Sequence, residues 1–226
     1  MKRAVLFALV LCASCLRGKP PVPILNYHSV GVRADEFTIT DAQFAQQLDW
    51  LKSEGYRTIA LHEALEPSPR AVVLTFDDGR DDALTRVLPA LKKRGMRAVF
   101  FIPTALVGKP GYLSWDGVRA LAAAGMEIGS HTVHHARLAE VSDEEVQDEL
   151  VQSRRTLEAQ LHAQVDLLAY PYNSVRRRVR AAAEAAGYRI AVSGVVHGGS
   201  DRLDLLRTSV SGLTTEEQFR RMVSSR

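Results

Sequence analysis

Short apolar runs alternate with segments of helical periodicity along most of the chain. Seven runs have the length and composition of β-strands, and several are continuously apolar, as parallel strands covered on both faces require. The expected strands are Val22–Tyr27, Arg57–Ala60, Ala71–Phe76, Ala98–Ile102, Met126–Gly129, Val165–Ala169 and Tyr188–Val192. This alternation predicts an α/β fold with a mostly parallel sheet. About seven β-α units favour a distorted or incomplete (β/α) barrel.

Helices are expected between these strands, and two of them carry start signals. Ser142 and Glu145 have the spacing of a capping box, which predicts that the longest helix begins directly after Ser142. Thr214 and Glu217 have the same spacing and predict a capping box before the last helix. A further helix is expected over residues 83–94, because a glycine follows it.

The size and composition of the chain indicate one globular domain. The chain has 226 residues, which is the usual length of one domain with a large core. Hydrophobic residues make up 46% and charged residues 24%, so neither a disordered chain nor a protein with many membrane spans fits. The net charge of +3 is too small to indicate a nucleic-acid partner. Oligomeric state is not determined by any of these features.

The first residues have the pattern of an export signal. Lys2 and Arg3 precede an apolar run over residues 4–13, which is too short to span a bilayer. Residues 1–18 are therefore expected to be a leader, and residues 19–226 the domain that functions outside the cytoplasm. The segment ending at Cys15 is similar to a bacterial lipobox, so attachment to a membrane through a lipidated Cys15 and simple cleavage both stay open. Periplasm, cell envelope and secretion are the alternatives for its location.

Polar and aromatic side chains follow four of the expected strands. In β/α barrels the carboxyl ends of the strands meet at one mouth, and the active site forms there. Four independent strands with such residues at the same end are therefore more informative than one polar loop. These residues are His28, Asp77 with Asp78, His131, and Tyr170 with Tyr172.

Two of these segments contain the side chains of a metal site. His131 and His135 are four positions apart and can present imidazole nitrogens to one cation, although His134 is an alternative to His135. Of the adjacent carboxylates Asp77 and Asp78, one can bind the metal while the other acts as a general base. Two imidazoles and one carboxylate suit a catalytic zinc ion or a non-haem iron. A hydrolase and an iron-dependent oxygenase are both consistent with this set, and the β-α alternation argues against the oxygenase.

Three segments together resemble a known family. Residues 75–79, 129–135 and 170–172 are similar to the first three motifs of the polysaccharide deacetylases, the NodB-homology domain of family 4 carbohydrate esterases. The resemblance implies a NodB-type barrel and a divalent metal, with zinc favoured over Co²⁺, Ni²⁺ or Fe²⁺. It implies these site residues: Asp77 as general base; Asp78, His131 and His135 as metal ligands; and Pro171, Tyr172 and Tyr170 in the substrate groove.

The start of the domain resembles one branch of this family. The segment from Pro23 to His28 is similar to that of deacetylases acting on poly-β-1,6-N-acetylglucosamine, which implies that His28 is the general acid. Three departures from the family pattern stand out. Ala169 occupies the place of an arginine that orients the base in many members, and a leucine-x-histidine segment near the C-terminus is missing. Asn173 replaces the glycine that usually follows the aromatic residue of the third motif.

The expected function is therefore removal of N-acetyl groups from a polysaccharide that contains N-acetylglucosamine. Peptidoglycan and chitooligosaccharides carry the same N-acetyl group and are alternative substrates. A glycan-binding protein with weak or no catalysis on the same fold is an alternative of another class, because the base-orienting arginine is absent from its usual position.

Overall fold

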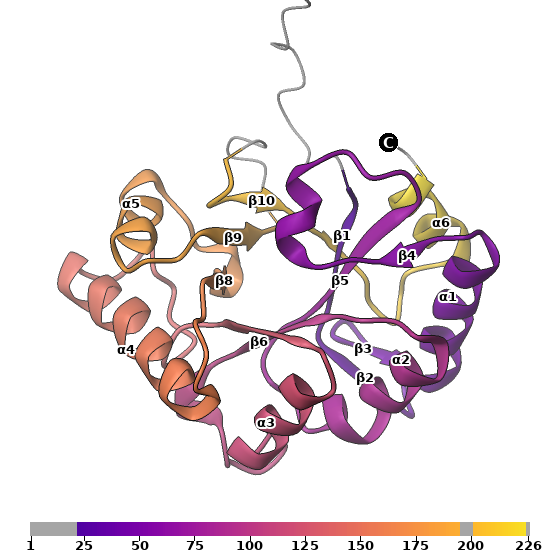
Figure 1. Ribbon diagram of the computed structural model, residues 1–226, viewed down its shortest axis with the longest axis horizontal. Coiled ribbons are helices and arrows are strands. Elements are labelled where there is room, and N and C mark those ends of the chain that lie inside the picture. The colour runs from indigo at the N-terminus through magenta and orange to yellow at the C-terminus, as the bar shows by residue number, and fades with distance from the viewer. Residues whose placement is uncertain (1–21, 195–200, 225–226) are drawn as a thin grey trace, which may run out of the picture.

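A curved parallel sheet surrounded by helices forms the body of the molecule (Figure 1). The computed structural model describes residues 22–194 and 201–224. Its main sheet has nine strands: β1 (Ile24–Tyr27), β4 (Arg57–Thr58), β5 (Ala71–Phe76), β6 (Val99–Ile102), β7 (Glu127–Ser130), β8 (Leu167–Ala169), β9 (Ile190–Ser193), β10 (Leu205–Leu206) and β11 (Thr208–Ser209). All seven expected strands are present, and the (β/α) barrel of the NodB type is confirmed.

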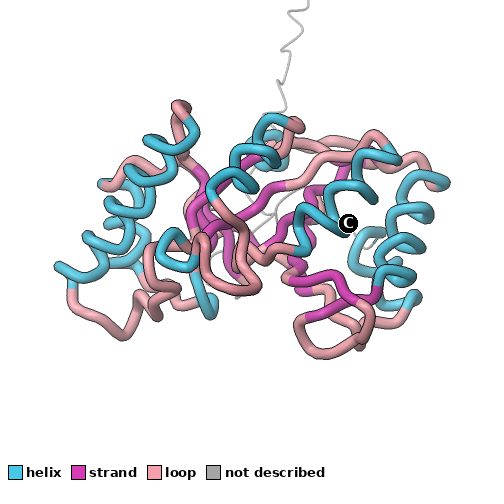
Figure 2. The backbone as a smooth tube through the Cα atoms, turned by 90° about the horizontal axis from the view of Figure 1, so that it is seen from below, coloured by secondary structure: helices cyan, strands magenta, loops and turns pink. Residues whose placement is uncertain are grey.

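Six α-helices in the described part of the chain cover the outside of this sheet, and Figure 2 shows them on both sides of the strands. They are α1 (Asp41–Ser53), α2 (Leu88–Arg94), α3 (Trp115–Ala123), α4 (Asp143–Leu161), α5 (Arg177–Ala185) and α6 (Glu216–Ser224). Four short helical turns add to them: η1 (Leu61–Leu65), η2 (Ala83–Val87), η3 (Thr104–Leu106) and η4 (Pro171–Asn173). A separate pair of strands, β2 (Ser29–Gly31) and β3 (Thr38–Thr40), follows β1.

Two very short strands that the sequence pattern does not reveal bring the edges of the sheet together. The strand order is β10-β9-β8-β7-β6-β5-β1-β11, so β10 and β11 lie at opposite ends of the sheet. In the chain, however, only Arg207 separates them. Leu205 pairs with Val192 of β9, whereas Thr208 pairs with Leu25 of β1. One segment thus contacts both edge strands and nearly closes the barrel at Arg207.

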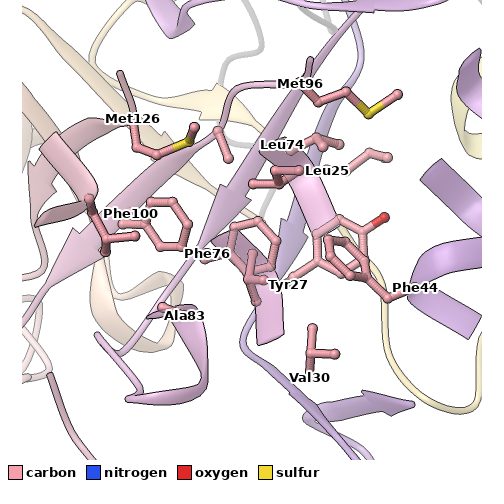
Figure 3. Close-up of a cluster of buried hydrophobic side chains, with 14 of the residues drawn as sticks. Leu25, Tyr27, Val30, Phe44, Leu74, Phe76, Ala83, Met96, Phe100 and Met126 are labelled. Atoms are coloured by element: carbon pink, nitrogen blue, oxygen red, sulfur yellow. The ribbon is translucent and has the colours of Figure 1, made fainter. Parts of the chain in front are cut away.

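The pleat of each strand divides the core into an inner and an outer layer, since successive side chains point to opposite faces. The inner layer is aliphatic and includes Val73 and Val99, together with the ring of Phe101. The outer layer faces the helices and includes a row of aromatic rings, seen in Figure 3. Phe76 stacks between Tyr27 at 5.2 Å and Phe100 at 5.0 Å. Burial of each such ring contributes about 1.5–3 kcal/mol to the free energy of unfolding. The stacked rings therefore hold β1, β5 and β6 side by side.

The helix ends agree with the sequence expectations in part. Ser142 caps α4, because its hydroxyl accepts a hydrogen bond from the Glu145 backbone N–H. The capping box expected from Thr214 and Glu217 is displaced by one residue: Thr215 and Gln218 make the reciprocal bonds. The expected helix over residues 83–94 divides into a π-helical turn, η2, and the α-helix α2.

The expected leader over residues 1–18, with Cys15, lies outside the described residues. Among the helices that are described, none combines the length and the apolar character needed to cross a membrane.

Candidate active site

The functional side chains gather where β1, β5 and β7 end. Inward-facing positions along β5 alternate, so Val73 and Thr75 are followed by Asp77 on the same side of the sheet. Asn26 is the matching inward position of β1, and its register partner is Thr75. His131 directly follows β7. Because the carboxyl ends of parallel strands meet at one mouth of the barrel, these residues lie at the same rim.

Three side chains at this rim have the geometry of a metal site. Asp78 Oδ1 lies 3.3 Å from His135 Nε2 and 3.6 Å from His131 Nε2. Ligand atoms about 2.0–2.2 Å from one zinc ion in a tetrahedron lie about 3.3–3.6 Å apart, so these separations fit a shared cation. The three ligand atoms lie within 4.8 Å of one another. The described residues thus bring together the ligand set that the family resemblance implies.

Contacts around His131 favour its neutral form with Nε2 free to bind a metal. Its Nδ1 is 2.8 Å from the carbonyl oxygen of Ala169, which selects the tautomer with a proton on Nδ1 and leaves Nε2 free for the metal. Burial lowers the pKa of His131, although the nearby Asp77 carboxylate opposes the shift. Ala169 thus supports the site through its backbone, whatever side chain it carries.

Backbone strain is concentrated at this rim. Of the seven non-glycine residues with positive φ among the described residues, five lie in or directly after the three motif segments: Asp78, Thr132, His135, Tyr172 and Asn173. Side-chain-bearing residues reach this conformation at a cost of about 1–2 kcal/mol each, and such strain often marks functional sites. Asn173 stands where the family usually has glycine, and its φ of 54° explains why either residue suits the position. Its Oδ1 also accepts a hydrogen bond from the Gly194 N–H.

Glu149 of α4 holds the turn that contains both histidine ligands. This carboxylate is buried, and its Oε2 accepts hydrogen bonds from the backbone N–H groups of Val133 at 2.8 Å and His134 at 2.9 Å. Its other oxygen lies 2.6 Å from His134 Nδ1. His134 therefore turns toward the helix, and the structure favours His135 as the second imidazole ligand. A charged residue on the apolar face of the helix, next to Leu150, was the sequence signal for this role.

Asp77 is buried and forms a two-pronged ion pair with Arg207. Its carboxylate oxygens accept hydrogen bonds from Arg207 Nη1 at 2.7 Å and Nη2 at 2.6 Å. Burial acts to raise the pKa of Asp77, but the Arg207 charge and then His131 outweigh it and hold this pKa below its usual range. Asp77 is therefore an ionised carboxylate, and its Oδ2 lies 3.9 Å from His131 Nε2.

Arg207 was missed by the sequence reasoning, which found no arginine at position 169. Its Nη1 also donates to Asn26 Oδ1 at 3.0 Å and to Thr75 Oγ1 at 3.2 Å. These contacts come from the point where the last strand segment changes its pairing partner. The available signal was a cationic residue directly after the apolar pair Leu205–Leu206.

His28 borders the other side of the two carboxylates. It is partly buried, its ring meets the exposed Phe37 edge-on at 5.4 Å, and its charge acts to lower the pKa of both Asp77 and Asp78. For Asp78, burial acts to raise the pKa, but the hydrogen bond with His135 and the charge of His131 together hold this pKa below its usual value. Strand β2, which directly follows His28, is held by Asp82, whose carboxylate accepts hydrogen bonds from the Ser29 hydroxyl and the Val30 N–H.

The third motif segment provides one exposed aromatic ring beside the metal ligands. Tyr172 is 54% exposed, and its ring lies 4.6 Å from that of His135. Pro171 is buried beneath it. Tyr170, expected in the substrate groove, instead packs in the core between the sheet and α5, and its hydroxyl donates to the carbonyl of Leu203. The alternation of the chain at this strand end turns Tyr170 outward toward α5, so Tyr172 alone of the two tyrosines can reach a substrate.

Comparisons with known proteins agree with this geometry. The sequence profile of the family described as polysaccharide deacetylase matches residues 64–191. YxkH of Bacillus subtilis, named as a polysaccharide deacetylase, is 30% identical over 179 residues, or 76% of this chain and 64% of that protein. The poly-beta-1,6-N-acetyl-D-glucosamine N-deacetylase of Escherichia coli is 28% identical over 48% of this chain and 20% of its own length. The chain spans less than two thirds of the length of these relatives.

A similar fold is found among solved structures. The deacetylase PplD of Streptococcus pyogenes, solved in complex with acetate, has a TM-score of 0.83 and 25% sequence identity, covering 90% of this chain and 98% of its own.

The arrangement of the two histidines predicts a difference between their variants. Replacement of His135 by alanine removes one ligand atom, so zinc affinity should fall by about 100-fold or more. Replacement of His134 by alanine removes only the contact of an exposed imidazole with Glu149, and zinc affinity should stay within about fivefold of the wild type. Competition with a chromophoric chelator measures both. Equal losses in the two variants would show that His134 is also a ligand.

Glu149 should support metal binding from outside the ligand set. The Glu149→Ala variant leaves two backbone N–H groups of the turn without their acceptor, so zinc affinity should fall by about 10- to 100-fold. The thermal midpoint of unfolding should fall as well. Asp148→Ala, at the exposed neighbouring position of the same helix, is the matched control and should change neither quantity. Wild-type zinc affinity in Glu149→Ala would contradict the role of this carboxylate.

Proposed function

Because this chain belongs to the polysaccharide deacetylase family, we propose that it is a metal-dependent hydrolase that removes N-acetyl groups from an N-acetylglucosamine-containing polysaccharide. The observation that carries the proposal is that two neighbouring carboxylates at the rim of the barrel have different surroundings. Asp77 is buried and held ionised by Arg207, whereas its neighbour Asp78 faces His131 and His135. A base and a metal-ligand set thus lie side by side.

The roles of the residues follow from this geometry. A divalent cation held by Asp78, His131 and His135 would polarise the acetyl carbonyl and lower the pKa of a bound water. Asp77 accepts the proton of the attacking water, since its carboxylate is ionised and close to the ligand set. Arg207 keeps that carboxylate oriented through two parallel hydrogen bonds.

The groups on either side of the metal ligands complete the proposed reaction. His28 donates a proton to the amine as the C–N bond breaks, which yields acetate and a free amino sugar. The backbone N–H of Tyr172, in the peptide bond that follows Pro171, donates to the oxyanion of the tetrahedral intermediate. The exposed ring of Tyr172 provides a flat wall for a sugar ring.

The substrate is proposed at the level of the class. The Escherichia coli relative is named for poly-β-1,6-N-acetylglucosamine, while peptidoglycan and chitooligosaccharides carry the same acetamido group. The solved Streptococcus pyogenes deacetylase holds acetate, which is the product expected here.

An extracytoplasmic location is part of the proposal. The charged and apolar pattern of residues 1–18 supports export, either with a lipidated Cys15 at the membrane or after simple cleavage. Polymers of the cell envelope or biofilm would then be accessible to the enzyme.

Acetate release from an N-acetylglucosamine oligomer tests the function directly. The zinc-loaded protein should release acetate, chelation should abolish the release, and added zinc should restore it. Asp77→Asn should lower kcat by about 10²- to 10⁴-fold with zinc content unchanged, because an amide cannot accept the proton. Asp81→Asn, an exposed carboxylate of the same turn, is the control. Near-normal turnover in Asp77→Asn would refute Asp77 as the base.

Arg207 should affect turnover more than metal binding. In Arg207→Met the buried Asp77 carboxylate loses its partner, which should destabilise the fold by about 3–5 kcal/mol. In Arg207→Lys a charge is kept but the two-pronged geometry is lost, so kcat should fall by about 10- to 100-fold with zinc affinity nearly unchanged.

Two further variants make this prediction decisive. The double variant Asp77→Asn with Arg207→Met should be more stable than Arg207→Met alone, as the unpaired charge is gone. Arg202→Met, at an exposed site of the same segment, should behave as wild type. Full activity of Arg207→Lys would mean that the position of Asp77 does not depend on Arg207.

A further inference from the structure

Arg137 lies beside the candidate active site and has no role in the proposed reaction. It follows the ligand His135 by two positions, and its side chain is exposed. Its guanidinium carbon lies 3.8 Å from the centre of the Tyr172 ring. The Tyr172 ring in turn lies 4.6 Å from the ring of His135. A single aromatic ring therefore separates this cation from a metal-ligand side chain.

The stacking fixes the guanidinium while leaving its hydrogen-bond donors open. A guanidinium that lies over a ring presents its N–H groups at its edge. In the described part of the chain, no carboxylate is within ion-pair distance of Arg137, and no acceptor takes a hydrogen bond from its side chain. Arg178 differs, because it donates to Asp143 and to the carbonyl of Val141. Arg137 is thus a positioned cation whose donors have no partner within the described fold.

The charges nearby do not oppose an anion at this place. Asp77 is neutralised by Arg207, and Asp78 together with two neutral imidazoles would leave positive charge on a bound divalent cation. A carboxylate that approaches Arg137 therefore meets no uncompensated negative charge from these two aspartates. The planar guanidinium matches a carboxylate with two parallel hydrogen bonds.

We propose that Arg137 binds a carboxylate carried by the glycan close to the acetamido group that is hydrolysed. The preferred substrate is then an acidic N-acetylated glycan, in which a sugar carries a lactyl or uronic carboxylate, over a neutral N-acetylglucosamine homopolymer. This inference rests on the proposed deacetylase function and specifies the substrate class of that same site.

A matched pair of substrates tests the role of Arg137. One is the oligosaccharide of alternating N-acetylglucosamine and N-acetylmuramic acid with free lactyl carboxylates, and the other carries these carboxylates as neutral methylamides. For the zinc-loaded wild type, KM should be about fivefold lower for the acid than for the amide. This difference should shrink at high salt, since the contact is exposed.

Three variants separate recognition of charge from support of Tyr172. In Arg137→Met the ratio of the two KM values should fall to about one, and Arg137→Lys should keep an intermediate ratio. Arg220→Met is the control, because Arg220 also stacks on an aromatic ring, Trp50, but on α6. The inference is overturned if the wild type shows equal KM values, or if Arg137→Met raises both KM values by the same factor.

Failure of the proposed function has a different signature. In that case the zinc-loaded wild type releases no acetate from the acid, the amide or a neutral N-acetylglucosamine oligomer. Calorimetric titration of wild type and Arg137→Met with the acid and the amide then decides the role of Arg137 by binding alone. Preference for the acid that depends on Arg137 supports the inference, and equal binding refutes it.

Discussion

The ion pair between Asp77 and Arg207 connects the closure of the barrel to its candidate chemistry. Removing two charges from water costs several kcal/mol for each ion, and the short two-pronged contact offsets that cost. Asn26 and Thr75 accept further hydrogen bonds from the same guanidinium. Arg207 lies where the final strand segment changes from β9 to β1. The segment that joins the edges of the sheet therefore also places the counter-ion of the base.

The metal-ligand set depends on support from a different part of the fold. Asp78 and His135 both have left-handed backbone conformations, which residues with side chains adopt only when their surroundings enforce them. The Glu149 carboxylate contributes to that enforcement by binding two N–H groups of the histidine turn. Helix α4 is thus both the outer cover of the sheet and the support of this turn. The aliphatic interior of the barrel beneath the rim provides the rigid base for both.

The rim has different chemistry on its two sides. His28 and the exposed Phe37 lie on the side of β1, and Tyr172 with Arg137 lies on the side of β8. An acid group for the leaving amine and a cation for the glycan would therefore act from opposite sides of the metal ligands. A polymer lying across the rim would contact both groups. Loop residues outside the motifs would therefore determine which polysaccharide is bound.

The sequence by itself determined seven of the nine strands of the main sheet and the position of the chemistry along them. Continuous apolar runs identified β5 with its bounds, and the rule that barrel sites form at strand ends selected Asp77 and His131. Both signals are local, because pleat and strand direction relate a residue to its immediate neighbours. Family resemblance then added roles to these residues.

Only the tertiary structure decided which groups complete the site. β10 and β11 have two residues each, too few for a periodic pattern, and Arg207 reaches Asp77 across 130 positions of the chain. The choice of His135 over His134 depends on Glu149 of a separate helix, and the burial of Tyr170 depends on packing against α5. Such contacts arise from the closing of the barrel, and sequence spacing does not encode the distance between residues that the fold brings together.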